Sequence, residues 1–174
     1  YAFETGQTAL ALTDHGNMSG LPHQVLHAKK MNEEGKKFKP IYGIEAYFID
    51  DLDMWKKEKE EHQSKQKKKK KEDTTGPVIE DEQASKRSAK HILNRRAHLV
   101  LLAQNQKGLN NLFSLVSKSY KEDNFYRFPR IDYKMLEEHH EGIIVSSACL
   151  GGPLSLEIGF TANFSGIAFQ SSTK

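Results

Sequence analysis

The sequence predicts an α/β fold, in which short apolar strands alternate with amphipathic helices. Four apolar runs have the length and composition of buried strands: 9–12, 38–48, 97–103 and 143–147. Two segments between them, 18–34 and 109–120, repeat their apolar residues at helical spacing. This alternation is typical of a parallel sheet or barrel. In such folds, ligands bind on the loops at the carboxyl ends of the strands.

The first strand runs into Thr13, Asp14, His15 and Gly16. An imidazole at a strand end is a candidate metal ligand, and a neighbouring carboxylate can fix its tautomer. We therefore single out His15 as a ligand and Asp14 as the residue that orients it. A second interpretation stays open, in which Asp14 caps the following helix and His15 is merely a polar residue.

The second strand, 38–48, contains Glu45 among apolar neighbours. A lone buried carboxylate is costly unless it is paired or bound to a metal, so Glu45 is a second candidate ligand. Alternatively, Glu45 faces solvent from an edge strand. The helix between the two strands has Pro22 in its first turn, and Gly35 is a suitable residue to end it.

Residues 51–90 differ in composition from the rest of the chain. They include five consecutive lysines, Lys67 to Lys71, and few large apolar side chains. Such a segment cannot bury enough surface to offset chain entropy. We expect a charged insertion that is helical near 53–63 and disordered around 65–75. The lysines are either a basic patch for DNA phosphates or part of a variable solvated loop.

The second half of the chain offers two more donors. His98 lies at the start of strand 97–103, and Cys149 follows strand 143–147. Cys149 is either a thiolate ligand or a small buried hydrophobic residue. Asp132 is expected to cap a short helix that ends at Glu138. The helix over 109–120 should face the core with Leu109, Leu112, Phe113, Leu115 and Val116.

Four separate strands thus each bring one residue that can bind a metal: His15, Glu45, His98 and Cys149. Nitrogen, carboxylate and thiolate donors together suit zinc or a similar transition metal. The sequence therefore predicts a shared metal centre, on condition that the four strand ends converge.

Bulk properties set the class of protein. The chain has 174 residues, a formal charge of +3 and a single cysteine. One cysteine forms no intrachain disulfide, which favours a reducing cytoplasm. No apolar run has the length of a membrane span, so we expect no membrane partner. The lysine run supplies much of the positive charge, which therefore says little about nucleic-acid binding by the fold itself.

Four stretches together resemble a known family: LALTDHGNMSG, KPIYGIEAYF, HLVLLAQNQKGLNNLFSLVS and FPRIDYKMLEEHHEGIIVSSACLGGPL. They are similar to the PHP (polymerase and histidinol phosphatase) domain, in the version that opens bacterial DNA polymerase III alpha subunits. Thr-Asp-His-Gly occurs in many PHP proteins. The His-Leu-x-Leu-Leu-Ala strand and Pro-Arg-Ile-Asp point to the polymerase branch.

The resemblance implies a distorted (β/α)7-type barrel, here incomplete and carrying a long lysine-rich insertion. It divides the chain into 1–50 and 91–154 as two parts of the PHP domain, 51–90 as the insertion and 155–174 as an atypical tail. By motif position, His15, Glu45, His98 and Cys149 match family metal ligands for zinc or manganese, and Asp14 supports His15. In the intact polymerase, which uses magnesium, the implied role is phosphoester or 3'-5' exonuclease hydrolysis alongside DNA and other replicase subunits.

The chain also departs from the family pattern. It begins after the family's His-x-His strand and lacks the late Asp-x-His motif, so we expect a fragment with weak metal binding and little activity. It also lacks the polymerase site. Two alternatives stay open, namely a free-standing phosphoesterase of the histidinol-phosphatase type and a metal-free docking module.

Overall fold

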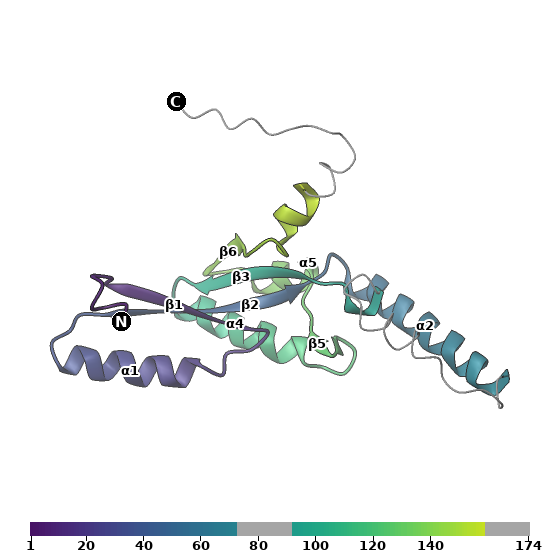
Figure 1. The fold of residues 1–174 in the computed structure, drawn as a ribbon, viewed down its shortest axis with the longest axis horizontal. Coiled ribbons are helices and arrows are strands. Elements are labelled where there is room, and N and C mark those ends of the chain that lie inside the picture. The colour runs from purple at the N-terminus through teal and green to yellow at the C-terminus, as the bar shows by residue number, and fades with distance from the viewer. Residues whose placement is uncertain (73–91, 159–174) are drawn as a thin grey trace, which may run out of the picture.

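The computed structural model describes residues 1–72 and 92–158, and a four-stranded sheet forms its centre (Figure 1). The sheet has the order β1-β2-β3-β6, and a second small sheet pairs β4 with β5. The strands are β1 (Ala9–His15), β2 (Lys39–Phe48), β3 (Ala97–Ala103), β4 (Phe125–Tyr126), β5 (Phe128–Pro129) and β6 (Ile143–Ser147). The helices are α1 (Leu21–Glu33), α2 (Leu52–Glu72), the 3-10 turn η1 (Ile92–Asn94), α4 (Gln106–Ser119) and α5 (Tyr133–His139).

The central sheet is mixed. β1 pairs with β2 in parallel, whereas β2–β3 and β3–β6 are antiparallel. The parallel sheet predicted from the alternation of strands and helices is therefore wrong for two of the three strand pairs. The chain leaves β2 and returns beside it, with Phe48 paired to Ala97, so β3 runs in the opposite direction. Two helices, α4 and α5, separate β3 from β6, and the chain reverses direction again.

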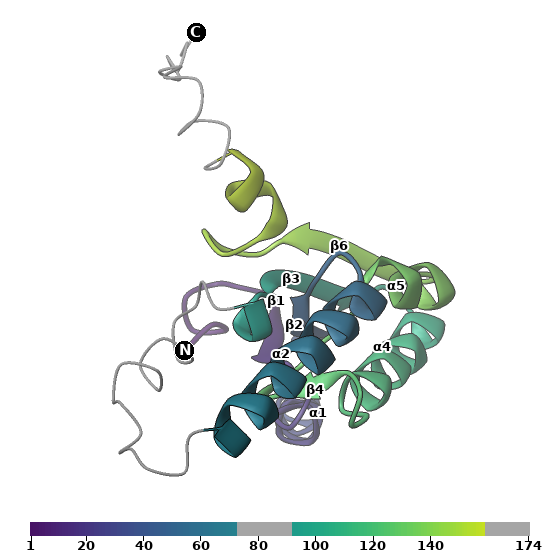
Figure 2. The ribbon, with the colours of Figure 1, turned by 90° about the vertical axis from the view of Figure 1, so that its right-hand side faces the viewer.

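Helices α1 and α4 lie on the same face of the sheet (Figures 1 and 2). Side chains alternate between the two faces of a strand. Ile44 and Leu101 therefore point toward the helices, while Glu45 and His98 point to the opposite face. This alternation separates the core from the candidate site, although β2 and β3 contribute side chains to both.

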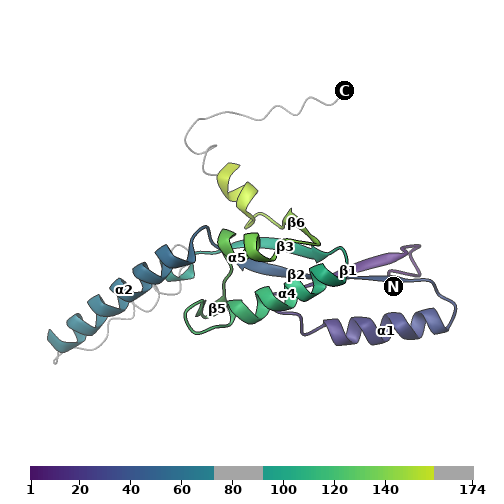
Figure 3. The same ribbon diagram turned by 180° about the vertical axis from the view of Figure 1, so that it is seen from behind.

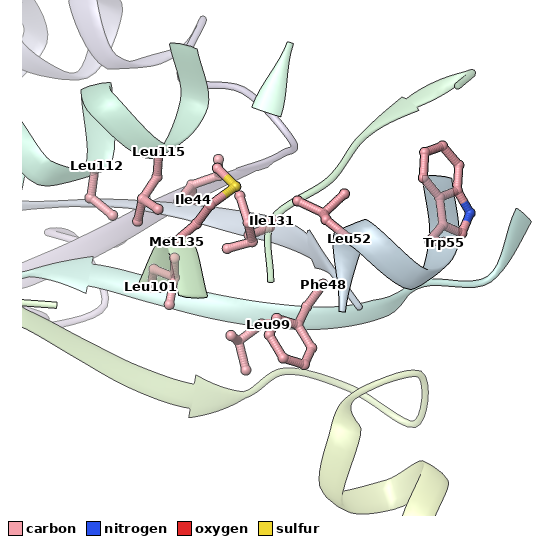
Figure 4. Packing of buried hydrophobic residues seen from close by; sticks show 11 residues of the cluster. Ile44, Phe48, Leu52, Trp55, Leu99, Leu101, Leu112, Leu115, Ile131 and Met135 are labelled. Atoms are coloured by element: carbon pink, nitrogen blue, oxygen red, sulfur yellow. The ribbon is translucent and has the colours of Figure 1, made fainter. Parts of the chain in front are cut away.

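The core lies between the sheet, α4 and α5 (Figure 4). Leu101, Leu112 and Leu115 are at most 1% exposed. The prediction that Phe113 belongs to this core is wrong, because its side chain is 43% exposed. Phe113 follows Leu112 directly, and a helix turns about 100° per residue, so Phe113 points away from the sheet.

Helix α2 extends away from the body of the molecule (Figure 3). It continues to Glu72, beyond the helix expected over 53–63 and into the stretch expected to be disordered. Lysine and glutamate are good helix formers, which explains a helix with so few apolar residues. Its first turn also joins the core, since Leu52 and Trp55 are each 3% exposed. Residues 73–90 of the expected insertion lie outside the described residues.

Several local expectations are confirmed. Asp132 caps α5, because its Oδ1 accepts a hydrogen bond from the Met135 amide at 2.9 Å. Its Oδ2 also accepts one from the Leu52 amide at 3.2 Å, which ties the starts of α2 and α5 together. Gly35 follows the end of α1 with φ +77°, a conformation that favours glycine.

The expected tail, 155–174, is described only as far as residue 158, at the end of a helical turn over 153–158. The division of the chain into four segments stays a prediction. Among the described helices, none combines the length and the apolar character that a membrane crossing requires.

Candidate metal centre

Three predicted ligands meet at one edge of the sheet. His15, at the end of β1, pairs with Glu45 of β2, and His98 of β3 pairs with Tyr47 two residues further along β2. Because β3 runs antiparallel to β2, the start of β3 lies at the edge where β1 ends. This direction explains how a histidine at the beginning of a strand reaches residues near the ends of two others.

Glu45 is the centre of the group. Its Oε1 lies 2.6 Å from Nδ1 of His98 and 3.3 Å from Nε2 of His15. One ligand atom from each of the three residues lies within 4.8 Å of the other two. The Glu45 side chain is 16% exposed, whereas that of His15 is 60% exposed. The group is therefore anchored on the sheet and open to solvent on the His15 side.

The donor chemistry fits a divalent transition metal. Two imidazole nitrogens and one carboxylate oxygen form a ligand set that zinc uses at sites with open positions. The alternative position of Glu45, facing solvent from an edge strand, does not occur, because β2 lies between β1 and β3. The three side chains are close enough for one cation to replace the direct contacts between Glu45 and the two imidazoles.

Cys149 lies at the border of this group. Its Sγ is 3.7 Å from Nδ1 of His98 and accepts a hydrogen bond from the Gly151 amide at 3.4 Å. The loop after β6 is held against β3, because the His98 amide donates to the Gly151 carbonyl at 2.8 Å. Cys149 is exposed, so its interpretation as a small buried hydrophobic residue is wrong.

Asp14 points to the helix side of the sheet. Its Oδ2 accepts a hydrogen bond from the amide of Gly20, the N-cap residue of α1, at 2.7 Å. As neighbours on one strand, Asp14 and His15 project to opposite faces. The structure thus places Asp14 as expected for the alternative interpretation, at the start of the following helix. Among the described residues, the carboxylate that contacts the His15 imidazole is that of Glu45.

Gly16 ends β1 in a conformation that suits glycine, with φ +69°. Its amide donates to the Glu45 carbonyl at 2.8 Å, which holds the end of β1 against β2. A Cβ atom at this position would lie 2.9 Å from Cγ of Pro129 and 3.0 Å from the Tyr47 ring. The close approach lets the β4–β5 hairpin pack directly beside the candidate centre.

Sequence reasoning missed the aromatic wall of the site. The Tyr47 ring centroid lies 5.4 Å from that of His98 and 6.3 Å from that of His15. Phe128 of β5 packs edge-on against Tyr47 at 5.0 Å. The sequence did contain a signal for Tyr47: side chains two residues apart on a strand share a face, so Tyr47 lies on the same face as Glu45.

Arg130 holds the loops behind this wall. Its side chain is fully buried and donates hydrogen bonds to four backbone carbonyls, those of Leu93, Arg95, Tyr126 and Phe128. Burial, reinforced by the positive charge of Arg96, lowers the pKa of Arg130 to about 10. The guanidinium thereby fixes both the segment that leads to His98 and the β4–β5 hairpin.

Comparison with known proteins identifies relatives of this chain. The model of the PHP domain family matches residues 1–168. The chain is 36% identical over 155 residues to the DNA polymerase III subunit alpha of Helicobacter pylori (strain ATCC 700392 / 26695), covering 89% of this chain and 10% of that protein. The Deinococcus radiodurans subunit is 37% identical over 147 residues, with 84% and 8% covered, and that of Aquifex aeolicus 36% over 152 residues, with 87% and 10% covered. The chain thus spans about a tenth of the length of these curated relatives, and it belongs to the PHP domain family.

Proposed function

We propose that this chain is the PHP domain of a DNA polymerase III alpha subunit and that it binds a divalent metal ion at the sheet edge. The proposed metal site rests on the position of Glu45, whose Oε1 contacts both His15 and His98. Similarity to polymerase subunits over 84–89% of the chain supports the placement in a replicative polymerase. The intact protein would then act in the cytoplasm with DNA and other replicase subunits, and its separate polymerase site would use magnesium.

In the proposed site, His15, Glu45 and His98 hold the ion, zinc or manganese, and Cys149 borders it. A bound divalent cation lowers the pKa of water and stabilises charge that develops on a phosphate. Glu45 fixes the relative position of the two imidazoles, because one of its oxygens contacts both. The Tyr47 ring packs against both imidazoles and restricts their rotation.

The reaction that fits this chemistry is hydrolysis of a phosphoester, as in 3'-5' exonuclease action by the intact polymerase. The exposed face of His15 leaves a side of the site open to a substrate. Because only three protein donors among the described residues are grouped within 4.8 Å, we expect the chain by itself to bind metal weakly. We therefore also expect it to hydrolyse little phosphodiester. Substrate affinity would have to come from groups beside the ligands.

Metal titration of the full 174-residue chain tests the proposal, with zinc and manganese followed by calorimetry. Glu45→Gln keeps the size of the side chain and removes its charge, and we expect the affinity to fall by roughly tenfold or more. Glu137→Gln, an exposed position on α5, is the matched control and should bind as the parent chain does. Cys149→Ser in the same assay decides whether the thiol is a fourth ligand.

Two outcomes would count against the proposed site. Equal metal affinity in Glu45→Gln and the parent chain would mean that the ion binds elsewhere. A folded parent chain that binds neither zinc nor manganese would favour the metal-free docking module. Circular dichroism of each variant establishes that the fold is retained before the affinities are compared.

A further inference from the structure

Beside the candidate metal centre, an arginine lies against two aromatic rings. Cζ of Arg96 is 3.9 Å from the ring centroid of Phe128 and 5.2 Å from that of Tyr47. We call Arg96, Tyr47 and Phe128 the arginine platform. Stacking of this kind holds a guanidinium in a fixed plane, while its outer N–H groups stay able to bind a ligand.

The arginine platform adjoins the metal ligands. Tyr47 belongs to both, since its ring packs against His15 and His98 as well as Arg96. Arg96 precedes His98 by two residues in the segment that enters β3, and alternate residues of an extended chain share one side, about 7 Å apart. One extended ligand can therefore contact the metal centre and the platform together.

Among the described residues, no acid forms a salt bridge with Arg96 that would balance its charge. Its Nη1 donates a hydrogen bond to the Asn94 carbonyl at 3.0 Å. Its Nε is buried and has no hydrogen-bond partner within the described part of the chain. The nearby Arg130 also has carbonyls as acceptors, and the charge of Arg96 contributes to the lowered pKa of Arg130. Two like charges at close range favour an anion between or beside them.

We propose that Arg96 binds a phosphate group of the substrate next to the metal centre, with Tyr47 and Phe128 holding its guanidinium in place. The inference rests on the proposed function, because it gives that site its substrate class, a nucleotide phosphate ester. Arginine suits the task because its planar fork binds two phosphate oxygens at once. In this arrangement the reacting phosphate would lie at the metal-binding residues. Arg96 would strengthen substrate binding by contacting a phosphate group next to them.

Binding of a fluorescently labelled single-stranded oligodeoxythymidylate to the full chain tests the proposal, measured by anisotropy with the metal chelated. Arg96→Gln should bind roughly tenfold to a hundredfold more weakly, the usual effect of losing a charged hydrogen bond. Arg95→Gln is the matched control, because it removes the same charge from the adjacent, exposed position. It should stay within about twofold of the parent chain, since exposed charges contribute little.

The salt dependence gives a second readout. Each phosphate contact adds about 0.7 to the slope of log affinity against log salt concentration for a single strand, and Arg96→Gln should lose one such contact. Equal affinity and slope in Arg96→Gln and the parent chain would overturn the proposal, as would equal losses in Arg95→Gln and Arg96→Gln.

A competition measurement and a second variant complete the test. Thymidine monophosphate as competitor, with thymidine as the control, distinguishes a terminal phosphate from an internal diester, and competition by thymidine alone would overturn a phosphate site. If Arg96→Gln does not fold, Arg96→Lys takes its place and should bind roughly threefold more weakly, because lysine lacks the planar fork. Affinity for zinc should be unchanged in both variants, so failure of this inference is distinguishable from failure of the metal site.

Discussion

Replacing Arg130 by methionine removes a buried charge and its hydrogen bonds while keeping much of the side-chain volume. We expect the free energy of unfolding to fall by about 1.5–6 kcal/mol. The guanidinium is 0% exposed, and the four carbonyls that it reaches belong to two separate segments, 93–95 and 126–128. The variant therefore tests whether one arginine holds the segment before β3 and the β4–β5 hairpin together.

The magnitude follows from two opposing contributions. Three of the hydrogen bonds are 2.6–2.9 Å long, and at about 1.5–3 kcal/mol for each bond to a charged group they sum to about 4.5–9 kcal/mol. Burial, together with the charge of Arg96, lowers the pKa of Arg130 to about 10, which corresponds to a cost of about 3 kcal/mol for the charged form. The difference between these contributions is the expected loss.

Urea unfolding measures this loss. Trp55, the single tryptophan, reports it by fluorescence, because its ring centroid lies 4.4 Å from Cζ of Arg130. Circular dichroism in the same titration excludes a local effect on the tryptophan alone. Arg127→Gln, at an exposed position of the same hairpin, should change the free energy of unfolding by less than about 0.5 kcal/mol. An Arg130→Met variant as stable as the parent chain would refute the reasoning. The free-energy cost of burying the charge would then equal the free energy gained from its hydrogen bonds.

Two further predictions concern other parts of the fold. Gly108→Ala should lower the free energy of unfolding by about 2–3 kcal/mol in urea titrations, because its Cβ would overlap the Gly142 carbonyl where α4 meets the turn before β6. A loss below about 0.5 kcal/mol would show that this turn moves freely. His139→Gln should reduce the loss of stability between about pH 7 and pH 5: burial, with Lys118 nearby, lowers the pKa of His139 below 6.5, so the unfolded chain binds the proton more readily and acidification favours unfolding. Melting temperatures across this range check the sign, and parallel curves for variant and parent chain would contradict it.

Local patterns predicted the elements whose formation depends on neighbouring residues. Strands 97–103 and 143–147 form with the expected bounds, since each is an apolar run between turn residues. The cap by Asp132 also depends only on the next three residues. The grouping of His15, Glu45 and His98 was accessible for a similar reason, because each is a polar residue at or near the end of an apolar strand.

The remaining features depend on residues far apart in the sequence. The direction of β3 depends on where the chain returns after its excursion from β2, and no local pattern encodes that. The arginine platform joins segments around positions 47, 96 and 128, so it emerges only when the fold is assembled. The burial of Trp55 was missed for a related reason, because the charged composition of 51–90 obscured two core residues at its start.

The direct pairing of Phe48 with Ala97 has a consequence for how this domain tolerates change. The chain leaves β2 and enters β3 at this one pair of residues, so the ends of the intervening stretch are held together whatever its length. Lengthening a flexible connection raises its closure free energy only slowly, by about 0.6 kcal/mol for each doubling. Beyond the turn anchored by Leu52 and Trp55, additions and deletions can therefore accumulate only a few residues from His98 and leave its position against Glu45 unaltered.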